Sequence, residues 1–310
     1  MQKVFSLLTP HSSLLIITLL LIILTACGED AMVTGFDDPT DNFAAATGNS
    51  DSTSLMQTQF YETYGSYLLF SDTLQHYSTG TNSEGEETWF TELLDLTYYV
   101  GQTNSSTATY GFTYLESMAR RREAVEYMQQ YILPHTQGSM KPFSWLLTWR
   151  INGTTNTGGT TSPYAVAGQR CVAVALYYIF TAQRSDSQKE ELAKRILLAL
   201  IGRLANNHAD SFTEFLSISA KYYDTPMTTD GSSLTSEEEM VLIHAAGFLN
   251  KTGNLVGSNY PSQADDLNQY ATLLLNYTSE QIAAKYADYP LIIRKAELMR
   301  TTMESLGYVF

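Results

Sequence analysis

The spacing of apolar residues changes once along this chain, and that change constrains the fold more than any other feature. From residue 60 to 150 the sequence is rich in Tyr, Thr, Phe and Trp, in short apolar runs bounded by Gly, Asn and Ser. Such runs favour strands and hairpins. Beyond a loop-like stretch at 152–161, apolar residues recur about every 3.6 positions, the period of a helix. We therefore predict an α+β fold with a small aromatic-rich, β-containing N-terminal part and a predominantly α-helical C-terminal part.

Several elements can be placed within these two parts. A strand is expected over 144–151, and 152–161 is expected to be a mobile loop by its composition. We predict helices over 118–133, closed by Pro134, and from Ser162-Pro163 to about Thr181. A last helix over 290–306 has apolar residues on one stripe and Gly307 positioned to cap it.

Further helix starts are indicated by capping boxes, in which a Ser or Thr side chain and an acid three positions later each satisfy a free backbone donor. A weaker version is formed by Ser262 and Asp265. The three stronger pairs are Ser187 with Glu190, Ser211 with Glu214, and Thr235 with Glu238.

Four segments are expected along the chain. Residues 1–26 have the plan of a signal peptide, with Lys3 near the start, an apolar run and small residues at the end. Residues 27–55 contain few large apolar residues and are predicted to be an acidic flexible tether. The rest is predicted to form an aromatic-rich α+β subdomain at 56–150 and a helical subdomain at 151–310.

The end of the apolar segment indicates a lipid anchor. Its last residues, Leu24-Thr25-Ala26-Cys27, resemble a bacterial lipobox, in which Cys27 would carry the acyl chains, palmitate among them. Several chains on one residue are enough for stable membrane anchoring. The following Gly28-Glu29-Asp30 resembles the acidic tag of Bacteroidetes lipoproteins at the outer face of the outer membrane. We therefore expect a lipid-anchored, outward-facing protein of the bacterial outer membrane.

Charge is distributed unevenly. No Lys or Arg and 14 acids lie between Cys27 and Ala119, whereas 17 basic and 18 acidic residues follow from Arg120 onward. A formal net charge of -14 repels nucleic acid phosphates, so nucleic acid is excluded as a partner. The asymmetry indicates that the two parts of the chain are used differently.

Catalytic signatures are missing from the sequence. It contains no H-E-x-x-H, phosphate loop or G-x-S-x-G elbow. The best candidate for a metal site is His208, Asp210 and Glu214, although these residues are better explained by a loop that contains His208 and a capping box that uses Glu214. Cys171 lies in an apolar run and is expected to be a buried small side chain. We predict no catalytic residue and no cofactor, with zinc as the open alternative.

Aromatic residues give a second functional indication. Exposed aromatic faces suit sugar rings or peptide side chains, although packing between hairpins explains most of them equally well. The cluster Glu84, Glu86 and Glu87 is expected to lie in a solvated loop. The candidate aromatics are Tyr61, Tyr64, Tyr67, Trp89, Phe90, Tyr98, Tyr99, Tyr110 and Tyr114.

Three stretches resemble the zinc-binding metallopeptidase-like lipoproteins of Bacteroidetes, which are linked to TonB-dependent nutrient uptake. These are 60–70, 211–217, which is similar to the D-F-x-E-x-x-S motif of that family, and 289–308. The resemblance implies a zincin-like helical core with Glu214 as a zinc ligand. However, this chain has Gln169 to Ala175 where the family has H-E-x-x-H. A catalytic zinc needs about three protein ligands and a base, so the resemblance implies a member without catalysis.

These observations lead to one expected function and two alternatives. The expected function is a non-catalytic accessory or binding protein in the acquisition of a glycan or peptide nutrient, partnered with a TonB-dependent transporter complex. The first alternative is a zinc-dependent hydrolase or peptidase with an atypical site. The second is a cell-surface adhesion or structural protein.

Overall fold

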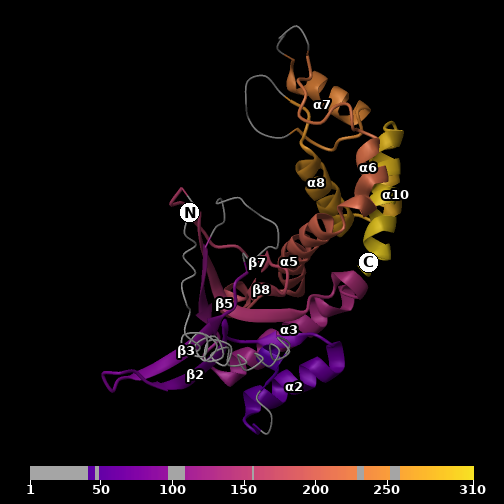
Figure 1. Ribbon diagram of the computed structural model, residues 1–310. Helices are drawn as coiled ribbons and strands as arrows, with labels where there is room; N and C mark the ends of the chain where they lie inside the picture. The colour runs from indigo at the N-terminus through magenta and orange to yellow at the C-terminus, as the bar shows by residue number, and fades with distance from the viewer. Residues whose placement is uncertain (1–40, 46–48, 97–108, 156, 229–233, 252–258) are drawn as a thin grey trace, which may run out of the picture. The chain divides into compact units, whose positions relative to one another are not determined.

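The computed structural model describes residues 41–45, 49–96, 109–155, 157–228, 234–251 and 259–310 (Figure 1). The chain divides into two units, 1–42 and 43–310. The predicted signal peptide, Cys27 and the acidic tag lie outside the described residues. None of the described helices combines the length and the apolar character that a bilayer crossing needs.

A sheet of six strands is organised around β5 (Ser144–Thr154). Strands β1 (Tyr67–Leu69) and β8 (Cys171–Ala175) both run parallel to its first half. Strands β4 (Thr109–Tyr114) and β6 (Thr160–Thr161) run antiparallel to its second half. Strand β7 (Ala165–Ala167) pairs antiparallel with β8 and extends the sheet on that side.

The two faces of this sheet belong to two hydrophobic clusters. Val172 and Val174 of β8 pack into the larger cluster, together with Trp145 and most of the helices. Cys171, Ala173 and Ala175 point the other way, into a smaller cluster. Every residue of β8 is buried. Because β8 is covered on both faces, it is apolar throughout rather than alternating.

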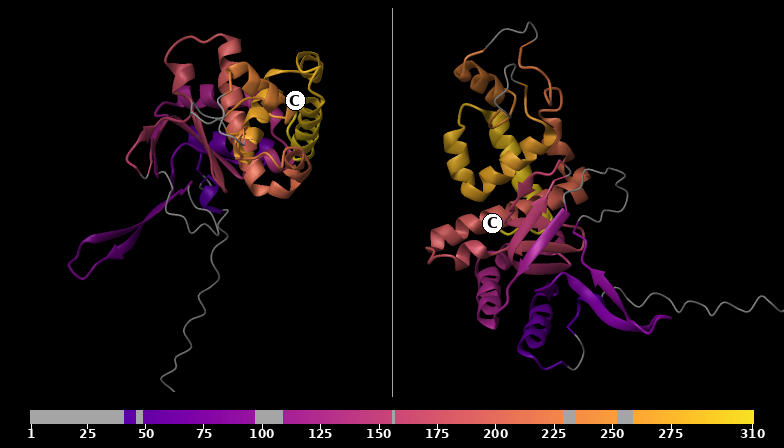
Figure 2. Two further views of the ribbon diagram at one scale, coloured as in Figure 1. Left: turned by 90° about the horizontal axis from the view of Figure 1, so that it is seen from above. Right: turned by 90° about the vertical axis from the view of Figure 1, so that its left-hand side faces the viewer.

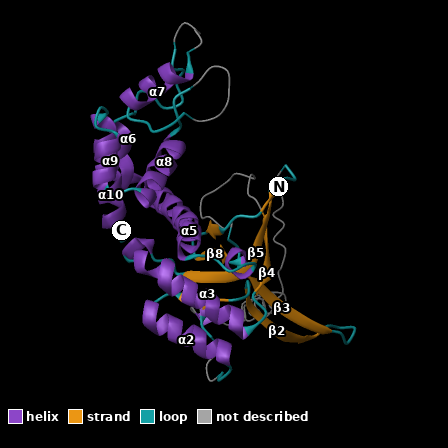
Figure 3. Cartoon of the chain, turned by 180° about the vertical axis from the view of Figure 1, so that it is seen from behind, coloured by secondary structure: helices purple, strands orange, loops and turns teal. Residues whose placement is uncertain are grey.

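Helices supply most of the larger cluster. They gather on the side of the sheet away from the hairpin formed by β2 (Thr73–Thr81) and β3 (Glu87–Leu93) (Figures 2 and 3). The longest, α5 (Asp186–Asn207), packs against α3 (Met118–Tyr131), β7 and α8 (Gln263–Asn276). The last helix, α10 (Pro290–Ser305), packs against α6, α7, α8 and α9. The remaining helices are α2 (Ser52–Tyr64), α4 (Tyr177–Phe180), α6 (Thr213–Ser217), α7 (Ser236–Ala245) and α9 (Ser279–Lys285), with 3-10 turns η1 (Asp41–Phe43), η2 (Leu133–His135), η3 (Gly138–Met140) and η4 (Ala209–Phe212).

The coarse fold prediction is confirmed, since strands dominate the N-terminal part of this unit and helices its C-terminal part. The helix predicted from Ser162-Pro163 to Thr181 is wrong: that range holds β7, β8 and only the short α4. The stretch 152–161, expected to be a loop, contributes the end of β5 and all of β6. The predicted boundary at residue 150 falls inside β5, and α2 begins at Ser52, within the predicted tether.

Helix starts agree with the capping predictions only in part. Thr235 and Glu238 form the predicted box at α7. At α5 the box is made by Ser185 and Gln188 rather than by Ser187 and Glu190. The box predicted for Ser211 and Glu214 is absent, because α6 continues directly from η4 and has no side-chain cap. Ser262 caps α8 by accepting the backbone N–H of Asp265.

A buried ion pair joins α8 and α10. The Lys295 Nζ donates to Asp266 Oδ2 at 2.5 Å and to Ser219 Oγ at 3.0 Å, and both charged side chains are fully buried. The Tyr223 hydroxyl also donates to Asp266 Oδ2, at 2.6 Å. Burial lowers the pKa of Lys295 and raises that of Asp266. Aromatic rings of Phe215, Phe248 and Tyr270 surround the ammonium at 4.5 to 4.9 Å.

Candidate functional site

The residues predicted as a metal site do not form one. His208 ends α5, Asp210 is exposed in η4, and Glu214 is exposed in α6. The Glu214 carboxylate accepts from Arg294 of α10 at 2.8 Å. Within the described part of the chain, no three His, Cys, Asp or Glu side chains are grouped closely enough to hold a metal ion. The D-F-x-E-x-x-S-like stretch thus carries a surface ion pair.

The segment aligned with H-E-x-x-H also differs from a zinc-binding helix. Gln169 lies in the turn before β8, and Cys171 begins that buried strand. The predicted buried role of Cys171 is confirmed, since its side chain is 1% exposed. Burial raises the pKa of its thiol to about 12, so it carries no thiolate near neutral pH.

The hairpin formed by β2 (Thr73–Thr81) and β3 (Glu87–Leu93) is the most exposed aromatic feature of the unit, and it extends away from the six-stranded sheet (Figures 1 and 2). Tyr77 lies opposite Phe90, with ring centroids 5.2 Å apart. On the other face, Trp89 stacks on His76 at 4.8 Å and 9°. Trp89 is 52% exposed, Tyr77 51% and Phe90 42%. Since side chains alternate along a strand, each face presents one aromatic pair.

The hairpin also carries several carboxylates. Glu84, Glu86 and Glu87 lie in and beside the turn of the hairpin, as predicted for a solvated loop, and Glu92 lies further along β3. The turn is closed by Asn82, whose Oδ1 accepts the backbone N–H groups of Glu84 and Glu86. No Lys or Arg occurs between residues 28 and 119. The hairpin therefore presents aromatic, hydroxyl and carboxylate groups without any cation of its own.

The other predicted aromatics are distributed between packing and surface roles. Tyr61 stacks on Tyr67 at 4.4 Å, Tyr64 packs on Phe60, and Tyr110 is half-buried. The Tyr114 hydroxyl donates to Asp72. Tyr98 and Tyr99 lie outside the described residues. Tyr77 was not among the aromatics predicted from the sequence. The signal that could have found it is its place in a run of strand-forming residues, in which neighbours such as His76 and Tyr77 face opposite sides.

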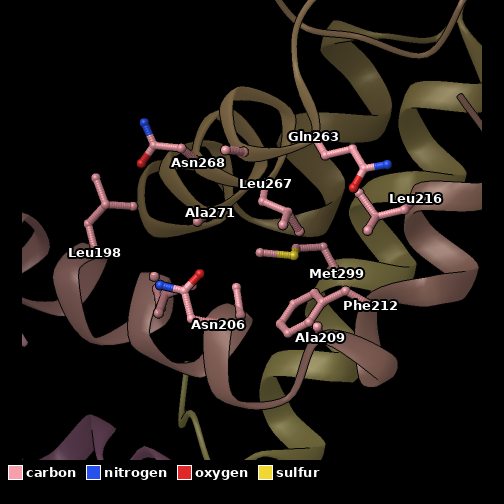
Figure 4. Close-up of a pocket in the computed structure, with 14 residues that line it drawn as sticks. Leu198, Asn206, Ala209, Phe212, Leu216, Gln263, Leu267, Asn268, Ala271 and Met299 are labelled. Carbon is pink, nitrogen blue, oxygen red and sulfur yellow. The ribbon is translucent and has the colours of Figure 1, made fainter. Parts of the chain in front are cut away.

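A second candidate site is a pocket of about 500 Å³ between α5 and α8 (Figure 4). Ile201, Phe212, Ala271 and Met299 form its buried base, and Leu198, Leu216 and Leu267 are half-buried at its sides. The walls of the pocket also contain small residues, which leave its volume open: Gly202, Ala205, Ala209 and Ala264. Its volume lies within the range of roughly 300–1,000 Å³ that is usual for ligand sites.

Gly202 is unusual for its position. It lies in the interior of α5, where Gly is about 1 kcal/mol less favourable than Ala. A Cβ at this position would meet no atom within 4 Å, and its φ is ordinary. The fold therefore does not require glycine here, and the missing side chain leaves room in the pocket.

The rim of the pocket carries amide side chains and no charge. Asn206 projects from α5 into the opening, and Gln263 and Asn268 lie on α8 at its edge (Figure 4). None of the three amides makes a side-chain hydrogen bond to another described residue. Neither carboxylate of α8 lines the pocket: Asp265 accepts from the Ser262 hydroxyl, and Asp266 pairs with Lys295. The pocket is thus neutral and apolar, with three free amides at its edge.

Comparisons with family models, with curated proteins and with solved structures give no significant match to this chain. The functional interpretation therefore depends on the two sites themselves.

Proposed function

We propose that this protein is a surface-exposed, outer-membrane lipoprotein that captures a neutral glycan as a non-catalytic accessory protein in nutrient acquisition. The observation that carries the proposal is the hairpin β2–β3, with exposed rings on both faces. Delivery to a TonB-dependent transporter complex is the role that fits such a protein at the outer membrane.

The chemistry of the hairpin favours a neutral sugar. Pyranose rings present apolar C–H faces that pack on exposed aromatic rings, while their hydroxyls need hydrogen-bond acceptors and donors. Trp89 on one face and Tyr77 on the other supply the rings, and Glu87 and Thr91 of β3 lie on the Trp89 face. The absence of Lys and Arg from residues 28–119 disfavours sulfated or carboxylated glycans.

Removal of either exposed ring should weaken glycan binding. We expect Trp89→Ala and Tyr77→Ala to lose at least about tenfold in affinity, roughly 1.4 kcal/mol. Native electrophoresis of the full-length protein in mild detergent, through gels containing starch, xylan, mannan or β-glucan, measures this as lost retardation.

Tyr277→Ala is the matched control, because Tyr277 is also an exposed tyrosine, 39% accessible, but lies at the end of α8. It should migrate like the wild type in every gel. If the wild type binds none of these polysaccharides but binds oligolysine, the acidic hairpin recognises basic peptides and the glycan proposal fails.

The anchor is tested separately. Cys27→Ser should abolish incorporation of labelled palmitate and release the protein from the membrane fraction, because the acyl chains need the Cys27 sulfur. Ser is close in size to Cys, so the fold should be unaffected, as circular dichroism would record. Undiminished labelling of Cys27→Ser would contradict the lipoprotein proposal.

The alternatives receive less support. A zinc hydrolase with a zincin-like core would have to use His208, Asp210 and Glu214, yet Glu214 is paired with Arg294. Stoichiometric zinc in purified protein, lost in Glu214→Ala, would favour that alternative. An adhesion role shares the exposed hairpin but predicts binding to intact host or neighbour cells rather than to soluble polysaccharides.

A further inference from the structure

We infer that the pocket between α5 and α8 is a second binding site, and that its ligand is a short uncharged peptide segment with aliphatic side chains. This inference uses no residue of the hairpin and does not depend on the glycan proposal. It depends on the chemistry of the pocket lining and on Gly202.

The lining distinguishes between classes of ligand. No charged side chain lines the pocket, so an ionic group would be desolvated there without a partner. No exposed aromatic ring lines it either, since Phe212, its one ring, is fully buried. A sugar would find nothing to stack on. Aliphatic groups, in contrast, would contact Leu198, Leu216 and Leu267.

The rim of the pocket supplies carboxamide groups that can form hydrogen bonds. A carboxamide is both a donor and an acceptor, as is a peptide unit, so each can satisfy both groups of the other. Asn206 on α5 points into the pocket and Asn268 lies on α8 at its edge, so a peptide backbone that crosses the opening would pass from one amide to the other (Figure 4). A plain acyl chain would leave these amides unused.

Gly202 provides the independent structural indication. A helix former at this position would stabilise α5 and meet no obstacle. Its place in the lining means that any side chain there would instead occupy space open to a ligand. Close approach of a ligand to the helix backbone is a common reason for such a glycine.

The test uses the full-length protein in mild detergent and a set of blocked tripeptides, N-acetylated and C-amidated, composed of Ala, Val, Leu, Ile and Met. Titration calorimetry should detect at least one binder, and isotope-edited NMR should show shifts in the side-chain amide signals of Asn206 and Asn268. Gly202→Leu should weaken binding at least tenfold while leaving helical content unchanged. Asn268→Ala should weaken it by about three- to tenfold.

Gly111→Leu is the matched control, because Gly111 in β4 also has an ordinary φ and open space around its absent Cβ. It should bind as the wild type does. Trp89→Ala should retain peptide binding, which separates failure of this site from failure of the glycan platform. The inference is overturned if no blocked peptide binds at millimolar concentration, if Gly202→Leu binds normally, or if maltotriose or 1-octanol binds here instead.

Discussion

Lys295→Met should be among the most destabilising substitutions in this protein, lowering the free energy of unfolding by about 3–5 kcal/mol at neutral pH. Met keeps most of the volume of the side chain but leaves the Asp266 carboxylate buried without its cation. Asp266 is poorly compensated already, because its Oδ1 has no hydrogen-bond partner among the described residues. Equilibrium unfolding in urea measures the loss.

The pH dependence should separate this charge effect from lost packing. Without Lys295, burial holds the pKa of Asp266 above its value of about 3.9 in the unfolded chain. A carboxyl with a raised folded pKa contributes stability that is fully present below the unfolded pKa and is lost as pH rises through the folded pKa. The deficit of Lys295→Met should therefore shrink as pH falls from 7 toward about 4, because the buried Asp266 takes up its proton above that pH, at its raised folded pKa.

The double substitution Lys295→Met with Asp266→Asn removes both charges. It should be more stable at pH 7 than Lys295→Met alone, because the introduced amide oxygen would still accept from the Tyr223 hydroxyl without a buried charge. Lys285→Met, on the exposed face of α9, is the matched control and should change stability by less than about 0.5 kcal/mol. A Lys295→Met deficit that is equal at pH 4 and pH 7 would mean that packing, rather than charge, dominates.

The ion pair shows how far the sequence alone could lead. The predicted inward stripe of the last helix contains Ile292, Ala296, Met299, Met303 and Leu306, and all five are buried. Lys295 lies on the same stripe, three residues after Ile292. The helical period of the sequence was therefore enough to predict that Lys295 is buried. The partner of Lys295 could not be predicted in this way, because Asp266 lies 29 residues away on another helix.

Strand β8 shows why the predicted helix from Ser162-Pro163 was wrong. A strand buried on both faces has no alternation to identify it, and a short apolar run cannot be assigned to strand or helix by periodicity. Gly168, in the turn between β7 and β8, was the signal against a continuous helix. A Cβ there would lie 2.7 Å from the Leu96 carbonyl oxygen, so the backbones approach closely at that turn.

The two candidate sites differ in how far they could be predicted from the sequence. Trp89 and Phe90 stood out because strand-forming aromatics occurred in a stretch without cations, and the hairpin that carries them is local in sequence. The pocket could not be predicted, since its lining comes from α5, η4, α6, α8 and α10, and only the tertiary packing brings them together. The one local indication was Gly202 within a helical pattern.

Gly307→Ala should cost at least about 3 kcal/mol, because two effects coincide. Gly307 has a φ of +100°, and an L side chain held in such a conformation is strained by about 1–3 kcal/mol. A Cβ there would also lie 2.0 Å from the Gln137 carbonyl oxygen, so the chain must move. That movement would break the bond from the Gln137 N–H to the Gly307 carbonyl, 2.8 Å, and the bond from the Met140 N–H to Leu306, 2.9 Å. Each such bond contributes about 0.5–1.5 kcal/mol.

Gly85→Ala separates the two effects. Gly85 has a φ of +83° in the turn of the hairpin, but a Cβ there would meet nothing within 4 Å, so only the backbone strain applies. Urea unfolding of both variants should show the larger loss in Gly307→Ala. Hydrogen exchange should speed up most at Gln137, whose N–H loses the Gly307 carbonyl, and less at Met140, whose N–H also donates to the Gln137 carbonyl. Equal losses in the two variants would mean that the segment after α10 moves away from Gln137 at little cost, and that it does not hold the C-terminal helix to the rest of the fold.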